Sequence, residues 1–203
     1  MLNRLYAITD RGLIQKSLEE DIEAAIRGGA GIIQLREKNI TDEKYAEYAA
    51  EALSVCKKYN VPLIINDNID VCLRSGADGV HLGQNDASPA DARRILGSRA
   101  IIGVTAKTAE QAQRAYCDGA DYIGSGAVFG TVTKDDAKKM SVDTLKEITA
   151  SSKLPVYAIG GINIDNAAEL AGSGIYGIAV VSGIFKGDIE ANAKKLREAV
   201  SRL

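Results

Sequence analysis

The chain has 203 residues, of which 46% are hydrophobic and 26% charged, with a formal net charge of −2. This composition suits one globular domain with a sizeable core, and it offers no basic surface for nucleic acid. No apolar run reaches the length of a membrane span, and no secretory segment precedes the first expected strand. Three widely spaced cysteines and a single histidine exclude a disulfide framework and a multi-histidine metal centre, so we expect a reducing, cytoplasmic location. The sequence leaves the oligomeric state open, with a homo-oligomer as one alternative.

A repeating pattern of helix, small-residue turn and apolar strand runs along the chain. Glycine-rich stops follow helical stretches at 28–31, 75–79, 118–121 and 172–174, where glycine supplies the left-handed cap that ends a helix. Apolar runs predict strands near residues 5–9, 31–37, 62–67, 79–83, 100–105, 121–128, 155–160 and 176–182. Amphipathic patterns predict helices between and after them, for example at 41–59, 88–96, 108–117 and 188–202.

Strands that are almost continuously apolar and alternate with helices are typical of a parallel sheet. Eight such units predict a single-domain (β/α)8 barrel over residues 1–203, with short loops because the chain is brief for that fold. A doubly wound open sheet is the structural alternative. In a barrel, the C-terminal ends of the strands form the face that carries activity, so polar residues at those ends are the candidates for function.

The second strand ends in the segment Gln34-Leu35-Arg36-Glu37-Lys38. Side chains alternate along a strand, so Gln34, Arg36 and Lys38 share one predicted face. Two cations on the face of a buried strand need an anion, because an unpaired buried charge is costly. Phosphate is a natural partner, since arginine offers a planar fork and lysine a point charge. The alternative is a pair of structural salt bridges at a strand end.

The third and fourth strands end in acidic and amide side chains. Asn66 and Asp67 close the third strand, and Asp86 follows the fourth. Two neighbouring carboxylates repel unless a cation or proton lies between them. With basic residues nearby, Mg²⁺ bridging Asp67 and Asp86 to a phosphate is one interpretation, because Mg²⁺ uses few protein ligands together with phosphate oxygens. The alternative is that the two carboxylates cap the helices that follow, with Ser88 a further candidate cap for the second of them.

His81, on the fourth strand, is the only imidazole in the chain, and Thr105 ends the fifth strand. A lone strand histidine is commonly a satisfied core residue, so contact with substrate is the competing interpretation and acid–base work is the least favoured. The segment 130–140 follows the sixth strand, is polar and carries Lys134. It is expected to be either a loop that closes over substrate or a plain solvated connector.

Glycines and a serine follow the last two strands. Gly160 and Gly161 follow the seventh strand, and Val181, Ser182 and Gly183 follow the eighth. Barrels commonly bind phosphate at this position through backbone N–H groups, and glycine lets an anion approach the main chain. A Gly-Gly pair alone is weak evidence, because most such pairs are simple turns.

The motifs taken together resemble the thiamin phosphate synthase family. They are Q-L-R-E-K at 34–38, I-N-D at 65–67, G-V-H-L-G-Q-x-D at 79–86, G-A-D-Y-I-G at 119–124, T-x-T-K at 131–134 and A-I-G-G-I at 158–162. The resemblance covers essentially the whole chain in the right order. It implies a transferase that joins hydroxymethylpyrimidine diphosphate to hydroxyethylthiazole phosphate with Mg²⁺, giving thiamin phosphate and diphosphate.

The resemblance also implies a role for each matching residue. Arg36, Lys38 and Lys134 would bind the diphosphate and act as the catalytic groups, and Asp67 and Asp86 would hold Mg²⁺. The implied substrate-binding residues are Gln34, Asn66, His81, Thr105, Thr131, Thr133, Gly161, Val181 and Ser182. Gln34, Asn66 and His81 would lie by the pyrimidine, while the threonines after the sixth strand and the residues after the seventh and eighth would hold the thiazole phosphate. The chemistry needs no protein nucleophile or strong base, only positioning and electrostatics.

The chain departs from the family pattern at four positions. Thr105 stands where serine is frequent, Lys107 where histidine is frequent, and Ala127 and Gly130 where prolines are usual. Two rivals remain open. A related thiazole tautomerase would use the histidine that is Lys107 here and would lack most of the cations and carboxylates named above. A non-catalytic barrel that binds a phosphorylated metabolite would release no diphosphate.

Overall fold

The computed structural model describes residues 3–130 and 140–203 and has eight parallel strands. The strands are β1 (Leu5–Ile8), β2 (Ile32–Leu35), β3 (Leu63–Asn66), β4 (Gly79–Leu82), β5 (Ile101–Thr105), β6 (Tyr122–Gly126), β7 (Val156–Ile159) and β8 (Gly177–Val180). Each strand pairs with the next, and β8 pairs with β1, so the sheet is a closed barrel. The (β/α)8 prediction is confirmed, and the open-sheet alternative is wrong. Each predicted strand coincides with an observed one, which is shorter by one to three residues at its ends.

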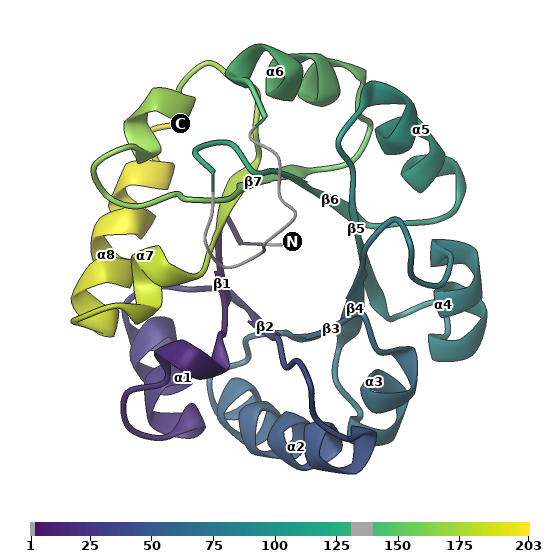
Figure 1. Ribbon diagram of the computed structural model, residues 1–203, viewed down its shortest axis with the longest axis vertical. Coiled ribbons are helices and arrows are strands. Elements are labelled where there is room, and N and C mark those ends of the chain that lie inside the picture. The colour runs from purple at the N-terminus through teal and green to yellow at the C-terminus, as the bar shows by residue number, and fades with distance from the viewer. Residues whose placement is uncertain (1–2, 131–139) are drawn as a thin grey trace.

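Helices form a ring around the barrel (Figure 1). They are α1 (Leu18–Arg27), α2 (Asp42–Lys58), α3 (Ile69–Ser75), α4 (Pro89–Leu96), α5 (Ala109–Cys117), α6 (Val142–Ser151), α7 (Ser182–Phe185) and α8 (Ile189–Val200). Two 3₁₀ helices add to them, η1 (Arg11–Leu13) after β1 and η2 (Ala167–Leu170) in place of an α-helix after β7. Among the described residues, no helix is long and apolar enough to cross a membrane.

The buried hydrophobic side chains form two clusters. The larger cluster lies between the strands and the surrounding helices, and its members are mainly aliphatic. The smaller cluster fills the inside of the barrel with Tyr6, Ile8, Ile32, Ile64, Tyr122, Tyr157 and Ala179. The three tyrosine rings pack edge to face with centroids 5.5–5.8 Å apart, a favourable geometry for aromatic pairs. This aromatic layer closes the interior of the barrel below the C-terminal ends of the strands.

Cysteines occupy both buried and exposed positions. Cys56 on α2 and Cys72 on α3 are buried, as small apolar residues in a helix core should be. Burial raises the pKa of each of these thiols to about 12. Cys117, at the end of α5, is exposed. All three are free thiols.

Candidate active site

A cavity of about 140 Å³ opens at the C-terminal ends of the strands. It collects side chains from the barrel interior and from the loops that follow the strands. The sequence-predicted site residues that line it are Gln34, Arg36, Asn66, His81, Thr105, Gly161, Val181 and Ser182. Residues from strands β2 to β5 and from the loops after β7 and β8 therefore meet at one opening.

Arg36 follows β2 and reaches the cavity from its rim. Its Nη1 atom lies 3.3 Å from Oδ2 of Asp10, and the side chains of the two residues are 14% and 24% exposed. Its backbone N–H donates to Oγ1 of Thr9 at 3.1 Å, which fixes the loop after β2 against β1. The salt-bridge alternative is thus realised for Arg36, but this pair leaves the residue on the lining of the cavity.

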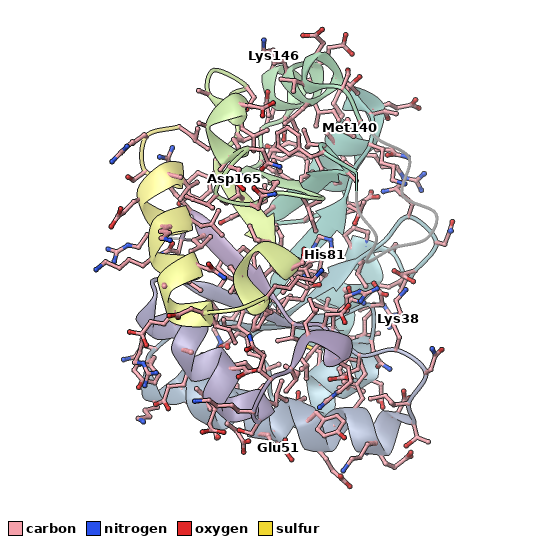
Figure 2. The ribbon with its side chains drawn as sticks, turned by 60° about the vertical axis from the view of Figure 1, so that its left-hand side comes forward. Lys38, Glu51, His81, Met140, Lys146 and Asp165 are labelled. Carbon is pink, nitrogen blue, oxygen red and sulfur yellow. The ribbon has the colours of Figure 1, made fainter. Side chains whose placement is uncertain are left out.

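Lys38 lies differently from Arg36. Strand β2 ends at Leu35. The predicted shared face therefore includes Gln34 and Arg36, the first residue beyond the strand, but does not extend to Lys38. Lys38 is exposed and is not among the lining residues, and Figure 2 labels it apart from His81. Its binding role stays a prediction. The acid between the two cations, Glu37, is buried and bonds to the Arg11 guanidinium through both carboxylate oxygens.

The two candidate metal ligands lie at neighbouring strand ends. Asp67 directly follows β3, with its N–H donating to the His81 carbonyl on β4 at 2.8 Å, and its Oδ2 accepts from Nδ2 of Asn66 at 2.6 Å. Asp86 lies in the loop after β4, where its Oδ2 accepts from the Gly83 N–H at 2.7 Å. Both carboxylates are exposed.

Neither carboxylate caps a helix. The side chain of Asn68 caps α3 and that of Ser88 caps α4, so the capping alternative for Asp67 and Asp86 is wrong. Within the described ranges, no group of three or more histidine, cysteine, aspartate or glutamate side chains could hold a metal ion. Two exposed carboxylates nevertheless suit a hydrated Mg²⁺ that takes its remaining ligands from water and phosphate.

His81 points into the barrel and is held by both ring nitrogens. Its Nδ1 lies 3.1 Å from the Tyr122 hydroxyl, and its Nε2 lies 3.0 Å from Oγ1 of Thr105. The ring also lies 5.5 Å from the Tyr122 ring, centroid to centroid. His81 is therefore both a hydrogen-bonded residue of the interior and part of the cavity lining, so the two sequence interpretations do not exclude one another.

The loops after β7 and β8 form the other side of the cavity. Gly160 and Gly161 have φ angles of 102° and 67°, a region that favours glycine. A Cβ on Gly161 would overlap the Gly130 carbonyl, so close packing of two chain segments also requires glycine here. Val181 and Ser182 follow β8, where Ser182 begins α7. Residues of both loops line the cavity, and the two glycines offer only main-chain atoms there, as phosphate binding would require.

Three expected site residues, Thr131, Thr133 and Lys134, lie outside the described residues, as does most of the expected lid segment 130–140. Other lining residues were missed by the sequence reasoning. Tyr6, Tyr122 and Tyr157 face the cavity from the barrel interior, and Lys107 reaches it from the loop after β5. The available signal was strand alternation, since Tyr6 and Ile8, like Tyr122 and Gly124, are two residues apart and share the inner face.

These features define a (β/α)8-barrel protein with its cavity at the end of the barrel where enzymes of this fold carry their active sites. The matching family model is described as thiamine monophosphate synthase and covers residues 5–184. The chain is 50% identical to a thiamine-phosphate synthase of Ruminiclostridium cellulolyticum over 196 residues, which is 96% of this chain and 93% of that protein. The chain belongs to the thiamine monophosphate synthase family.

Two further relatives agree with this assignment. A thiamine biosynthetic bifunctional enzyme of Arabidopsis thaliana is 46% identical over 97% of this chain and 39% of its own length. The solved structure of a thiamine phosphate pyrophosphorylase from Pyrococcus furiosus superposes with a TM-score of 0.89, is 38% identical, and covers 98% of this chain and 95% of that chain. The expected family and transferase activity, thiamine-phosphate synthesis, are confirmed.

Proposed function

We propose that the chain joins hydroxymethylpyrimidine diphosphate to hydroxyethylthiazole phosphate in the cavity at the strand ends, and that Mg²⁺ is required. The observation that carries this proposal is the meeting of two groups of residues in one cavity. Arg36, Gln34, Asn66, His81 and Thr105 come from β2 to β5, while Gly161, Val181 and Ser182 come from the loops after β7 and β8. We assign the first group to the pyrimidine diphosphate and the second to the thiazole phosphate.

The reaction breaks the bond between the pyrimidine methylene carbon and the diphosphate oxygen, and the diphosphate leaves with the electron pair. The thiazole ring nitrogen then forms the new bond to that carbon. The aminopyrimidine ring, rich in electrons, supports the positive charge that develops on the methylene carbon. This displacement is dissociative, and it asks the protein for orientation and charge stabilisation rather than for a nucleophile.

The residues of the chain have distinct tasks in this scheme. Arg36, with Lys38 and Lys134, would neutralise the departing diphosphate, because guanidinium and ammonium groups bind phosphate oxygens strongly. Gln34, Asn66, His81 and Thr105 would orient the pyrimidine, and Thr131 and Thr133 would join Gly161, Val181 and Ser182 at the thiazole phosphate. When bound, Mg²⁺ would supply further charge neutralisation at the diphosphate, held by Asp67 and Asp86.

The cysteine usage supports a cytoplasmic location, since all three thiols are free.

A ³¹P NMR assay with both substrates and Mg²⁺ tests the reaction directly. We expect the signals of the two substrates to be replaced by those of thiamin phosphate and free diphosphate. Binding of either substrate without diphosphate release would instead indicate a non-catalytic barrel. Conversion of thiazole carboxylate phosphate alone would indicate a tautomerase, because an isomerase needs no second substrate.

A further inference from the structure

A chain of hydrogen bonds crosses the inside of the barrel beneath the cavity. Nε2 of Gln34 donates to the Tyr6 hydroxyl at 2.6 Å, and the Tyr6 and Tyr122 hydroxyls lie 2.8 Å apart. Tyr122 continues the chain to Nδ1 of His81 at 3.1 Å, and Nε2 of His81 reaches Oγ1 of Thr105 at 3.0 Å. The proposed function uses Gln34, His81 and Thr105. It assigns no task to the two tyrosines that connect them.

Two glycines on neighbouring strands make room for this chain of hydrogen bonds. Gly103 on β5 stands in register between His81 on β4 and Tyr122 on β6. A Cβ at Gly103 would overlap the Tyr122 ring, so the missing side chain lets the phenol cross β5 and reach His81. Gly124 makes similar room on the other side, since a Cβ there would lie 3.1 Å from Cε1 of His81. Two glycines on the inner face therefore hold open the path between Tyr122 and His81.

The donors and acceptors along this chain fix the order of its protons. The Tyr6 oxygen accepts from Gln34. The single Tyr6 hydroxyl proton is then donated to the Tyr122 oxygen, which is its acceptor among the described residues. The Tyr122 proton must then go to Nδ1 of His81, which leaves the ring proton on Nε2 as a donor to Thr105. Burial raises the pKa of both phenols far above neutrality, so each phenol keeps the proton that this order needs.

The order leaves a defined pair of groups facing the cavity. Within the described part of the chain, every buried side-chain nitrogen or oxygen has a hydrogen-bond partner. Gln34 is only 2% exposed, and its amide nitrogen donates to Tyr6. Because Gln34 lines the cavity, its Oε1 must be open to that cavity. Thr105 accepts from His81, so its own hydroxyl proton is left to donate. The cavity floor thus presents one acceptor and one donor.

We propose that Tyr122 is a positioning residue, which holds His81 in the Nε2–H tautomer and, through Tyr6, holds the Gln34 amide with its oxygen toward the cavity. The inference rests on the proposed function only in the ligand it names, an aminopyrimidine. Such a ring offers an exocyclic amine as donor and a ring nitrogen as acceptor, which complement Gln34 Oε1 and the Thr105 hydroxyl. A pyrimidine with the two groups exchanged would meet donor against donor and acceptor against acceptor.

The tautomer can be measured without any turnover. Because His81 is the only histidine, ¹⁵N-histidine labelling gives a single imidazole in long-range ¹H–¹⁵N spectra. In the unaltered protein we expect Nε2 to have the shift of a protonated nitrogen and Nδ1 that of an acceptor. In Tyr122→Phe, which removes one hydroxyl and keeps the ring, we expect this preference to be lost. An Nδ1–H tautomer in the unaltered protein, or an unchanged spectrum in the variant, would overturn the proposal.

Tyr157→Phe is the matched control. The Tyr157 ring packs against Tyr6 and Tyr122, but its hydroxyl donates to the Asn3 carbonyl at 2.6 Å, outside the chain of bonds. This variant therefore loses a phenol hydrogen bond from the same aromatic layer, and we expect it to keep the His81 tautomer. Loss of the tautomer in both variants alike would reject a specific role for the Tyr122 hydroxyl and indicate a general loosening of the core.

Steady-state kinetics give the second readout. In Tyr122→Phe we expect the KM for the pyrimidine diphosphate to rise about tenfold, the equivalent of one well-placed hydrogen bond, with the KM for the thiazole phosphate unchanged. Equal rises in both would contradict pyrimidine positioning. The two proposals fail separately, because an unaltered protein that releases no diphosphate but shows the Nε2–H tautomer refutes the proposed reaction and leaves the tautomer assignment supported.

Discussion

Arg36 and Asp10 form an ion pair at the rim of the cavity, with Nη1 and Oδ2 3.3 Å apart. The pair joins the loop after β2 to the segment between β1 and η1. A contact of this kind costs the guanidinium little of its donor capacity, since arginine carries five N–H donors in a fixed fork. Asp10 therefore holds Arg36 at the lining of the cavity, where its guanidinium can face a phosphate ligand.

Arg36→Ala should lower turnover by about 100-fold or more while leaving the fold intact. The reason is that a preorganised donor aimed at developing negative charge is commonly worth that much in the rate. The rate of diphosphate release in the ³¹P assay measures the first effect, and the thermal unfolding midpoint measures the second.

Arg27→Ala is the control for removing an arginine from an ion pair. Arg27 bonds to Glu190 at 2.9 Å on the surface, with its side chain 51% exposed, and it is not a lining residue. We expect turnover within about twofold of the unaltered protein, because exposed pairs contribute little. Near-normal turnover in Arg36→Ala would reject its assigned role.

Removal of divalent metal should abolish diphosphate release, and Mg²⁺ should restore it. In the proposed function, Asp67 and Asp86 hold a hydrated Mg²⁺ at the diphosphate, and both residues are exposed, so a chelator can remove the ion. Treatment with EDTA followed by titration with Mg²⁺ tests this expectation. Activity that persists through thorough chelation would remove both residues from the metal role.

Asp67→Asn and Asp86→Asn should each raise the Mg²⁺ concentration needed for half-maximal activity. Asp70→Asn is the matched control, because Asp70 is a nearby, 63% exposed carboxylate that pairs with Arg74 on α3. We expect this control to keep the Mg²⁺ dependence of the unaltered protein. An equal shift in all three variants would indicate a general effect of surface charge.

The fold was predictable because its signals are local. Buried parallel strands are apolar throughout and end at turn residues, so each predicted strand coincides with an observed one. The rim positions of Gln34 and Asn66 follow from the same rule, since both stand at or next to the end of a strand. The positions of Gly161 and Ser182 at the rim could be predicted for the same reason.

The parts of the site that sequence reasoning missed depend on contacts between distant segments. The Tyr122–His81 bond requires Gly103 to stand between them in register, and no pattern within one strand reveals this. The pairing of Arg36 with Asp10 depends on the path of the segment after β1. Capping by Asp67 and Asp86 was the alternative to a metal role because Asp is a common cap, but Asn68 and Ser88, two residues or fewer further along, perform that function.

Alkylation of the folded protein should modify Cys117 and spare Cys56 and Cys72. The thiolate is the reactive form, and burial raises the pKa of the Cys56 and Cys72 thiols to about 12, so almost none of either is ionised at pH 8. Cys117 is exposed to the reagent. Peptide mass mapping after iodoacetamide treatment, with and without denaturant, gives the result. Fast labelling of Cys56 in the folded state would contradict its burial.

Gly161→Ala should weaken binding of the thiazole phosphate as well as lower stability. Gly161 has φ 67°, which costs an alanine about 1 kcal/mol or more, and a Cβ there would also overlap the Gly130 carbonyl across the cavity loops. The added atom must push the loop after β7 away from the segment that precedes the T-x-T-K motif. We expect the KM for the thiazole phosphate to rise by at least about tenfold.

Gly76→Ala separates backbone strain from this effect on the site. Gly76 ends α3 with φ 70°, nearly the same angle, but a Cβ there would meet no atom within 4 Å. Both variants should lose stability through the left-handed backbone, by about 1 kcal/mol in denaturant unfolding for Gly76→Ala and by more for Gly161→Ala. Only Gly161→Ala should change the KM for the thiazole phosphate, because only its Cβ displaces a wall of the cavity. If the two variants share the same stability loss and neither changes that KM, the loop after β7 does not hold the thiazole phosphate.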